Sequence, residues 1–453
     1  MSRYTAATDA DRRAMLAAIG AASIEDLFAD VPESVRLGRP LDLPDGMAEQ
    51  EVVDHLSGLA ARNRHADEEV TFLGAGMYDH YVPSIVDALT QRSEFLTPYT
   101  PYQPEISQGG LQAMFEFQTA ISELTGLPVA NASLYEGPSS VASAGYLARL
   151  ENGRRRFVAS RGVHPHSRET LATYARGFGA EVVETPLDDR GATDVEALAA
   201  AVDDDTAAVF LQQPSFLGTV EDLGPLAEAA KRTGAVLVCA VDPLILGILR
   251  PPGELGVDVA VGEGQTLGNR LDFGGPSFGF FAARERYIRR MPGRIAGQTV
   301  DVDGRRGFVL TLQTREQHIR REKATHNICT SQALNALAGV IYLSWLGRRG
   351  IVELGELMLR RTAYAREALG LELLNPGPVV REFAVRVPGG PGGGLDALFE
   401  RARAEGVNPG YRLGRDYPEY EDGLLVAITE RRTRADIDRL ARLATGVREE
   451  VPA

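Results

Sequence analysis

The sequence predicts an α/β protein with a mostly parallel central sheet and a smaller C-terminal α/β domain. Between Gly110 and Ala283, short apolar strand segments alternate with helical segments, which is typical of a parallel sheet covered by helices on both faces. An apolar helical segment at 334–346 bridges to the second domain. Segment 371–447 then repeats the alternation on a smaller scale.

The first 65 residues are expected to form a helical arm. Asp9 is placed to cap an amphipathic helix that runs through Ala21, a short helix restarts at Ser23, and apolar residues at helical spacing predict another at 47–64. The predicted organisation is an N-terminal helical arm at 1–65, a large α/β domain at 66–330 and a small C-terminal α/β domain at 331–453.

The central domain is expected to contain six strands, at 156–159, 181–184, 207–211, 235–240, 257–261 and 278–282. Helices are expected between them at 170–177, 195–202 and 223–233, the last closed by Gly234. The C-terminal domain is expected to run from a strand at Leu371 through a Gly-rich turn at Pro388–Gly394, a helix and a strand at 423–428 to a last helix.

Composition limits the class of protein. The chain has 453 residues, too many for one ordinary core, and its 44% apolar content is normal for a soluble globular protein. No stretch approaches the roughly 18 apolar residues of a membrane helix, and the N-terminus has no apolar signal core. We therefore expect a soluble, cytoplasmic protein that is not inserted in a membrane.

Charge and cysteine content exclude further classes. The net charge of −14 argues against nucleic-acid binding, and in the most basic segment, Arg315–Lys323, acids are interleaved with the bases. Cys239 and Cys329 lie far apart, and neither has metal-ligand spacing to a second cysteine or a histidine pair. We expect no disulfide framework and no metal site.

Asp242 follows directly on the apolar strand at 235–240. Open α/β sheets place ligand contacts at the carboxyl ends of their strands, and pyridoxal-phosphate (PLP) enzymes use an Asp at such a place to pair with the pyridinium nitrogen. Taken alone, the segment favours the plainer interpretation of a cap or turn residue.

The Gly-rich segment 262–276 begins 20 residues after Asp242 (262 minus 242). In aminotransferase-like enzymes such a segment carries the lysine that forms the imine with PLP, and here Gln265 takes that position. An amide cannot form an imine. The alternative is that this segment is a Gly-rich loop unrelated to any cofactor site. The only lysines of the chain, Lys231 and Lys323, lie in polar helical segments, which do not favour a buried imine-forming amine.

The segment 131–144 places small polar residues and Gly137 before a predicted helix. Helix N-termini after such loops bind phosphate, and in the aminotransferase fold the cofactor phosphate lies here. Glu136 is unfavourable for a phosphate, so capping and close helix packing are the favoured interpretation.

Several long strings together resemble one family, the glycine decarboxylase P-protein of the glycine cleavage system, and within it the alpha chain (subunit 1) of the two-chain form. The strings are Phe72–His80, Tyr99–Gln108, Leu111–Thr119, Gly262–Gly275, Met291–Gly297 and Leu312–Thr330. The resemblance covers nearly the whole chain. His326 departs from the family pattern, where a small residue is expected.

The resemblance implies a fold-type-I PLP-dependent transferase (aminotransferase-like) architecture. It implies a homologous beta chain (subunit 2) that carries the cofactor lysine, an α2β2 assembly, and decarboxylation of glycine with transfer of the aminomethyl group to the lipoyl arm of the H-protein. The T- and L-proteins complete the cycle. This chain would then be an inactive subunit when alone, without a catalytic residue or a covalently bound PLP of its own.

Fold-type-I sites commonly lie at dimer interfaces, so this chain can still line the partner's site. Tyr99, Tyr102 and Gln103 are the candidates, because their segment is polar, aromatic and unlike a core strand. The equal alternative is that they brace the interface. Asp242 and Gln265 mark a degenerate cofactor pocket.

Three alternatives stay open from the sequence. The Arg315–Lys323 segment, expected to be helical, is a docking site for an acidic H-protein surface or, as favoured, pairs its ions within the chain or with the beta chain. The chain as a whole is alternatively a structural or regulatory homologue without an active-site contribution. It is alternatively an autonomous PLP lyase that uses Lys323.

Overall fold

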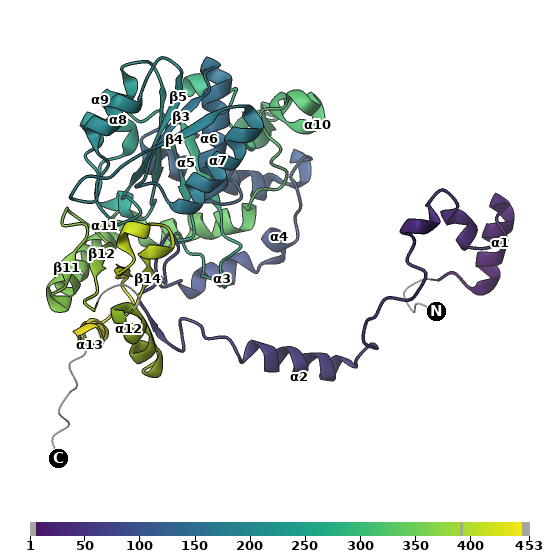
Figure 1. Ribbon diagram of the computed structural model, residues 1–453. Coiled ribbons are helices and arrows are strands. Elements are labelled where there is room, and N and C mark those ends of the chain that lie inside the picture. The colour runs from purple at the N-terminus through teal and green to yellow at the C-terminus, as the bar shows by residue number, and fades with distance from the viewer. Residues whose placement is uncertain (1–5, 390–392, 446–453) are drawn as a thin grey trace. The chain divides into compact units, whose positions relative to one another are not determined.

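The computed structural model describes residues 6–389 and 393–445 of the chain (Figure 1). The chain divides into two units, Met1–Asn63 and Arg64–Ala453. The first unit contains α1 (Asp9–Ile19), η1 (Glu25–Phe28), η2 (Glu33–Val35) and α2 (Glu49–Ala60). The cap of α1 is Thr8 and not Asp9, because the Thr8 hydroxyl accepts the Asp11 N–H in a capping box.

The helices of the first unit have no core of their own. Within residues 6–63 no side chain is buried. Large apolar side chains remain exposed instead, among them Met15, Ile19, Phe28, Leu41, Leu43 and Leu56. An isolated helix of this length is marginal in water without tertiary packing.

The second unit is built on a seven-stranded sheet with the order β2-β8-β7-β6-β5-β3-β4. Its strands are β2 (Val129–Ala130), β3 (Arg156–Ser160), β4 (Glu181–Thr185), β5 (Thr206–Gln213), β6 (Val236–Val241), β7 (Val259–Glu263) and β8 (Gly279–Ala283). The strands from β4 to β7 pair in parallel, and β8 is antiparallel to both of its neighbours. This confirms the predicted mostly parallel sheet.

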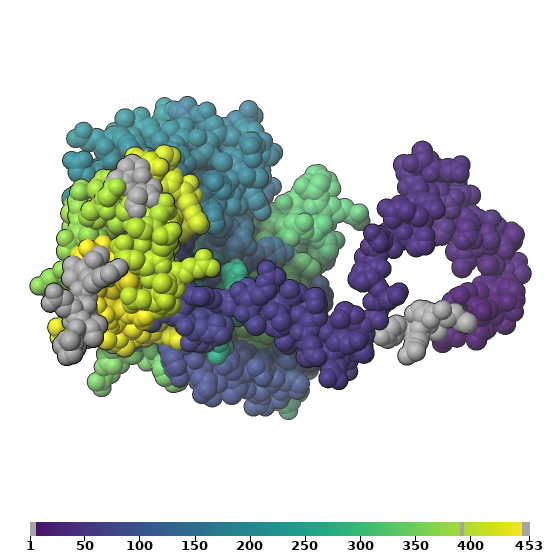
Figure 2. Space-filling model, turned by 60° about the horizontal axis from the view of Figure 1, so that its bottom comes forward, coloured from purple at the N-terminus to yellow at the C-terminus, as the bar shows by residue number. Residues whose placement is uncertain are grey.

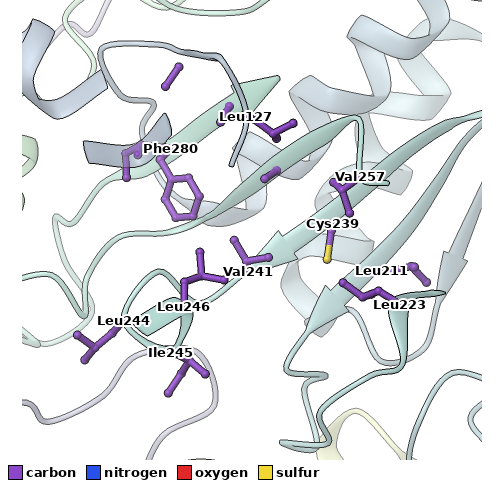
Figure 3. Close-up of a cluster of buried hydrophobic side chains, with 14 of the residues drawn as sticks. Leu127, Leu211, Leu223, Cys239, Val241, Leu244, Ile245, Leu246, Val257 and Phe280 are labelled. Carbon is purple, nitrogen blue, oxygen red and sulfur yellow. The ribbon is translucent and has the colours of Figure 1, made fainter. Parts of the chain in front are cut away.

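Helices cover both faces of this sheet. Strand β6 is fully buried, with Val236, Val238 and Ala240 in the core under α6 (Gly137–Asn152) and α7 (Pro165–Phe178). Its alternate residues lie in the opposite core, which Figure 3 shows: Val241 lies beside Leu246, just beyond the strand end, and Cys239 lies near Val257 and Leu223. That core packs against α5 (Gln108–Thr125), α8 (Val195–Ala201), α9 (Leu223–Lys231) and α11 (Ala333–Leu369).

The C-terminal part forms a second, four-stranded sheet with the order β11-β12-β15-β14. Its elements are β11 (Glu372–Leu373), β12 (Glu382–Arg386), β14 (Tyr411–Arg412), β15 (Gly423–Ala427), α12 (Gly393–Ala404) and α13 (Arg434–Thr445). Of the predicted Gly-rich turn, residues 390–392 lie outside the described residues. The yellow-green C-terminal residues lie against the teal part of the unit (Figure 2), where Phe216 and Leu217 share a core with Leu413 and Leu425.

Helix α11 leads into this second sheet. The predicted helix at 334–346 forms the part of α11 before Gly347, which breaks the helical geometry with φ +59° and ψ −179°. Further short elements are β1 (Val70–Thr71), β13 (Val407–Asn408), α3 (Ser84–Thr90), α4 (Ser93–Leu96), η3 (Pro104–Ile106), η4 (Ile245–Gly247), η5 (Pro252–Leu255), η6 (Glu285–Tyr287), η9 (Leu413–Arg415) and η10 (Pro418–Tyr420). No helix in the described ranges is both long and apolar enough to cross a membrane.

The Arg315–Lys323 segment is not the single helix that the sequence predicts. It follows a hairpin of β9 (Ile295–Val300) and β10 (Arg306–Thr311) and divides into η7 (Gln313–Arg315), α10 (Gln317–Arg320) and η8 (Arg321–Lys323). Arg315 and Glu316 are buried while the following seven residues are exposed, and Arg321 has a φ of +54°. A surface helix would bury residues that recur every three or four positions, not two consecutive residues followed by seven exposed ones. Figure 1 shows α10, in green, at the outer edge of the second unit.

Candidate active site

A cavity of about 600 Å³ opens at the carboxyl ends of β3, β5, β6 and β7. This is where open α/β sheets bind ligands. The strand ends contribute His164, Gln212, Asp242 and Glu263; the loop after β1 contributes Tyr78; and the C-terminal part contributes Arg381 and Glu382. Asp242 therefore directly follows a buried strand, as the sequence predicts, and lines the cavity at the end of that strand.

The carboxylate of Asp242 already forms an ion pair with a side chain of this chain. The buried Arg381 guanidinium donates one hydrogen bond to the Asp242 carboxylate and another, of 2.9 Å, to Nε2 of His80. Nδ1 of His80 therefore carries the hydrogen and donates to Glu430 over 2.7 Å. Burial opposes ionisation of Glu430, but His80 and backbone N–H donors bring its pKa down to about 2.

The same guanidinium lies against Tyr78, with its Cζ 3.2 Å from the ring centroid. The Tyr78 hydroxyl donates to Glu382 over 2.7 Å, and the Ala75 N–H donates to the other Glu382 oxygen over 2.7 Å. A Cβ at Gly74 would lie 2.3 Å from this carboxylate, so the loop needs glycine there. The C-terminal part thus holds the loop and the sheet together across the cavity.

Gln265 is buried behind the cavity wall. Its side-chain oxygen accepts the Tyr78 N–H over 2.8 Å, and its amide nitrogen donates to the Tyr78 and Asn269 carbonyls over 3.1 and 2.8 Å. Thr266, not Gln265, lines the cavity beside Asp242. The amide therefore fixes the backbone of the loop and makes no contact with the cavity.

Two carboxylates occupy the N-terminus of α6. Glu136 is the N-cap and accepts the Ser139 N–H over 3.1 Å, and Glu263 accepts the Gly137 N–H over 2.9 Å. Burial raises the pKa of Glu263. The phosphate interpretation of segment 131–144 is not supported, because its helix N–H groups already bind carboxylates and a phosphate would meet two like charges.

His164 faces the cavity as a neutral imidazole. Its Nε2 donates to the Ala75 carbonyl over 2.9 Å, its Nδ1 accepts the His166 N–H over 3.1 Å, and the ring packs edge-on against Phe216. Burial lowers the pKa of His164 to about 4. The ring is therefore uncharged at neutral pH.

These residues do not fit PLP, and the cavity is closed in the sense that its own side chains close it to this cofactor. The carboxylate that would pair with a pyridinium is bound by Arg381, the helix N-terminus that would bind phosphate carries Glu136 and Glu263, and Gln265 offers no amine. Lys323 does not replace the amine, because it is exposed and does not line the cavity. The sequence did not indicate Arg381, Glu382, Tyr78 or His164, which come from segments far from Asp242.

The predicted lining residues Tyr99, Tyr102 and Gln103 lie on another surface and do not line this cavity. Tyr99 is 78% exposed and Tyr102 45%, and Gln103 is exposed as well. One link leads back: the Tyr99 hydroxyl lies 4.0 Å from the Cys329 sulfur, and the Cys329 N–H donates over 3.2 Å to the hydroxyl of Tyr135, which lines the cavity.

The cations of the 317–323 loop are unpaired. Among the described residues, Arg320, Arg321 and Lys323 have no ion pair, and the buried Arg315 instead donates to the Met291, Gly293 and Leu312 carbonyls. Within the described residues these three cations therefore do not pair with the rest of the chain, whereas Glu316 of the same segment lies 3.6 Å from the buried Arg294. Pairing of the loop with the beta chain stays a prediction.

The cysteines and carboxylates give no further site. Cys239 is buried and Cys329 exposed, and both are free thiols. Within residues 6–389 and 393–445, no group of three or more His, Cys, Asp or Glu side chains is arranged to hold a metal ion.

Solved structures confirm the predicted architecture. A crystal structure of glycine decarboxylase (P-protein) of the glycine cleavage system, in inhibitor-bound form, matches with a TM-score of 0.87 and 43% identity over 98% of this chain and 100% of that chain. A sphingosine-1-phosphate lyase from Burkholderia pseudomallei shares the fold at 17% identity, with a TM-score of 0.63 over 92% of this chain and 94% of that chain. The fold is that of the fold-type-I PLP enzymes.

Sequence comparison is more specific. A protein from Moorella thermoacetica and one from Carboxydothermus hydrogenoformans, both named probable glycine dehydrogenase (decarboxylating) subunit 1, are 50% and 49% identical. The matches cover 98% of this chain and 99% and 100% of the relatives. The family model described as glycine cleavage system P-protein matches residues 2–443. From the sheet and its closed cavity to the match over nearly its full length, the chain belongs to the glycine cleavage system P-protein family.

Proposed function

We propose that this chain is the alpha subunit of a two-chain glycine dehydrogenase (decarboxylating) and acts only together with a homologous beta subunit. The pair binds glycine, releases CO2 and transfers the aminomethyl group to the lipoyl arm of the H-protein, and the T- and L-proteins complete the cycle. The observation that carries the proposal is the closed cavity, in a chain whose relatives are named as subunit 1 of this enzyme.

PLP is held by a lysine of the beta subunit and supplies an electron sink for the carbanion that decarboxylation leaves. None is covalently bound by this chain, where Gln265 stands in place of the lysine and the residues around Asp242 bind one another. The contribution of this chain is to shape and complete the partner's site.

Two surfaces support a partner chain in a soluble, cytoplasmic α2β2 assembly. The apolar side chains of residues 6–63 are exposed, and in a folded subunit such side chains are normally covered. Tyr99, Tyr102 and Ile106 form an exposed aromatic and apolar group in the second unit. Tyrosines are enriched in protein interfaces, which favours a role for Tyr99 and Tyr102, with the neighbouring Gln103, at the rim of the partner's site.

Co-expression with the beta chain tests the proposal. Neither chain alone is expected to catalyse glycine–bicarbonate exchange with lipoylated H-protein, and the purified assembly is expected to do so. Borohydride reduction followed by mass spectrometry is expected to find PLP on the beta chain only. A reduced adduct on Lys323 would overturn the division of labour in favour of an autonomous lyase.

A second experiment separates this proposal from a purely structural or regulatory role. Tyr99→Phe, Tyr102→Phe and Gln103→Ala are introduced singly into the assembled enzyme. A fall in exchange activity with unchanged assembly mass supports site lining. Unchanged activity in all three variants favours a role for this chain as scaffold.

A further inference from the structure

The most constrained group outside the closed cavity surrounds Tyr102. Nη2 of Arg294 donates to the Tyr102 hydroxyl oxygen over 2.6 Å, and its Cζ lies 5.1 Å from the centre of the ring. The ring of His318 packs edge-on against the same tyrosine at 5.5 Å. Tyr102 is thus held by a cation and an imidazole while its other side is open.

The side chain of Arg294 is itself held in place by a buried carboxylate. It is 4% exposed and lies 3.6 Å from Glu316, which is 3% exposed and also lies 3.6 Å from Nδ1 of His318. Arg315 fixes both loops, because it donates over 3.1 Å to the Gly293 carbonyl next to Arg294 and precedes Glu316 in the chain. The side chains of Arg294 and Glu316 are therefore fixed in position before any partner chain binds.

This arrangement decides the direction of the Tyr102 hydroxyl hydrogen. A guanidinium has only donors, so Arg294 occupies a lone pair of the phenol oxygen and the phenol hydrogen must point elsewhere. Within the described residues no side chain or carbonyl accepts that hydrogen. Tyr102 therefore presents a hydrogen-bond donor to the outside.

Two buried atoms of the same group lack partners. Arg294 Nε and Glu316 Oε1 make no hydrogen bond, although buried polar atoms are normally paired. Tyr99 and Cys329 connect this surface through Tyr135 to the mouth of the cavity at the sheet. Buried charges kept incompletely paired beside an exposed hydroxyl are more typical of a functional site than of a core.

We infer that Arg294, supported by Glu316, is a positioning residue that fixes Tyr102 as a donor to an anionic oxygen in the site of the partner subunit. The inference rests on the proposed function, in which that site holds two such groups, the carboxylate of glycine and the phosphate of PLP. Both are recognised by hydroxyl donors. The geometry identifies the Tyr102 hydroxyl as the donor. Kinetic and binding measurements then decide whether the acceptor is the carboxylate of glycine or the phosphate of PLP.

The test uses the assembled two-chain enzyme with Tyr102→Phe, Arg294→Met, Arg294→Lys and the double variant Tyr102→Phe/Arg294→Met. Loss of one hydrogen bond to a charged group is expected to raise the KM for glycine about tenfold, with a smaller change in kcat, if the acceptor is the carboxylate. If the acceptor is the phosphate, the Kd for PLP rises by a similar factor instead.

A positioning role for Arg294 predicts a specific pattern among the variants. The double variant is expected to be no worse than Tyr102→Phe alone, because Arg294 acts through that hydroxyl, and Arg294→Lys is expected to recover part of the loss. Glu316→Gln, which keeps the shape of the cluster, is expected to give a weaker effect in the same direction. Melting temperature and assembly mass identify any variant that does not fold.

The inference is overturned if Tyr102→Phe changes both the KM for glycine and the Kd for PLP by less than twofold in an intact assembly. It is equally overturned if the effects of Tyr102→Phe and Arg294→Met multiply, because Arg294 would then act elsewhere. Failure of the proposed function is distinct: the wild-type assembly itself would then show no exchange.

Discussion

The guanidinium of Arg381 binds the carboxylate of Asp242 at the carboxyl end of β6, inside a cavity whose position suggests a cofactor. The two residues are 139 positions apart and directly flank β6 of the seven-stranded sheet and β12 of the four-stranded sheet. Their bond joins these sheets from within the cavity.

Breaking this pair is expected to destabilise the chain. Arg381→Met leaves Asp242 and His80 without their partner in a mostly buried position, which costs roughly 3 kcal/mol of the free energy of unfolding. Denaturant unfolding measures it. The double variant Arg381→Met/Asp242→Asn is expected to lose less than the two single variants together. Arg349→Met, which removes an exposed pair on α11, is the control and is expected to leave the free energy of unfolding nearly unchanged. Equal losses for the buried and the exposed pair would contradict this account.

Introducing the missing amine is not expected to restore cofactor binding. Gln265→Lys supplies the amine but leaves Glu136 and Glu263 at the helix N-terminus, so titration with PLP is expected to show no imine absorbance. Adding Glu136→Gln and Glu263→Gln removes the like charges and is expected to tighten PLP binding about tenfold or more over Gln265→Lys alone. If Gln265→Lys binds PLP as tightly as the triple variant does, charge is not what closes the cavity.

Acid is expected to destabilise the chain through His164. Its pKa is about 4 in the folded chain against an ordinary 6.5, so the unfolded chain binds more protons between these values. The stability it contributes is full above pH 6.5 and is lost as the pH falls towards 4, by roughly 3 kcal/mol at most. Melting temperatures between pH 7 and 4 measure this. His164→Gln keeps a donor for the Ala75 carbonyl and is expected to give a flatter profile. A profile as steep as the wild type's would assign the pH dependence to other groups.

The unpaired cations of the 317–323 loop are expected to serve a partner that binds and leaves. Transient interfaces use complementary charge, which acts mainly on association and fades with salt. The triple variant Arg320→Glu/Arg321→Glu/Lys323→Glu is expected to raise the KM for H-protein about tenfold or more at low ionic strength, with less than a twofold change in the KM for glycine. Arg348→Glu, an exposed change on α11, is the single-charge control. Loss of assembly with the beta subunit in the triple variant would instead assign the loop to that proposed interface.

The exposed apolar side chains of residues 6–63 are expected to be needed for assembly. The second unit has its own cores, so a chain without residues 1–63 is expected to fold, with a melting temperature within a few degrees of the intact chain. It is expected to lose most of its affinity for the beta subunit, measured by analytical ultracentrifugation of the mixed chains. Replacing Leu41 and Leu43 with Ser is a smaller change in the same direction. Undiminished assembly of the shortened chain would give these residues another role.

The sequence predicted the parts of the fold that depend on local pattern. The buried strands and the position of Asp242 at a strand end follow from hydrophobic runs, and both appear in the structure. The partners of Asp242 and Gln265 could not be predicted, because Arg381 and Tyr78 approach them only after the two sheets dock.

One other miss has a physical cause as well. Arg315 and Glu316 belong to a string of charged residues that reads as a solvated helix, yet both are buried, where carbonyls and Arg294 compensate their charge. A lone sequence cannot show that compensation. Glu136 is the opposite case, because the favoured capping interpretation of its segment is confirmed: its carboxylate caps α6 by accepting the Ser139 N–H.

The closed cavity has a consequence for how the enzyme is supplied with its cofactor. A protein that binds a cofactor gains stability with the concentration of that cofactor. This chain supplies from its own sequence the bonds that hold its cavity, so under the proposed function its folded amount would follow its synthesis and not the supply of PLP. Folded copies of this subunit would then remain when PLP is scarce, and enzyme activity would return as soon as PLP-loaded partner chains appear.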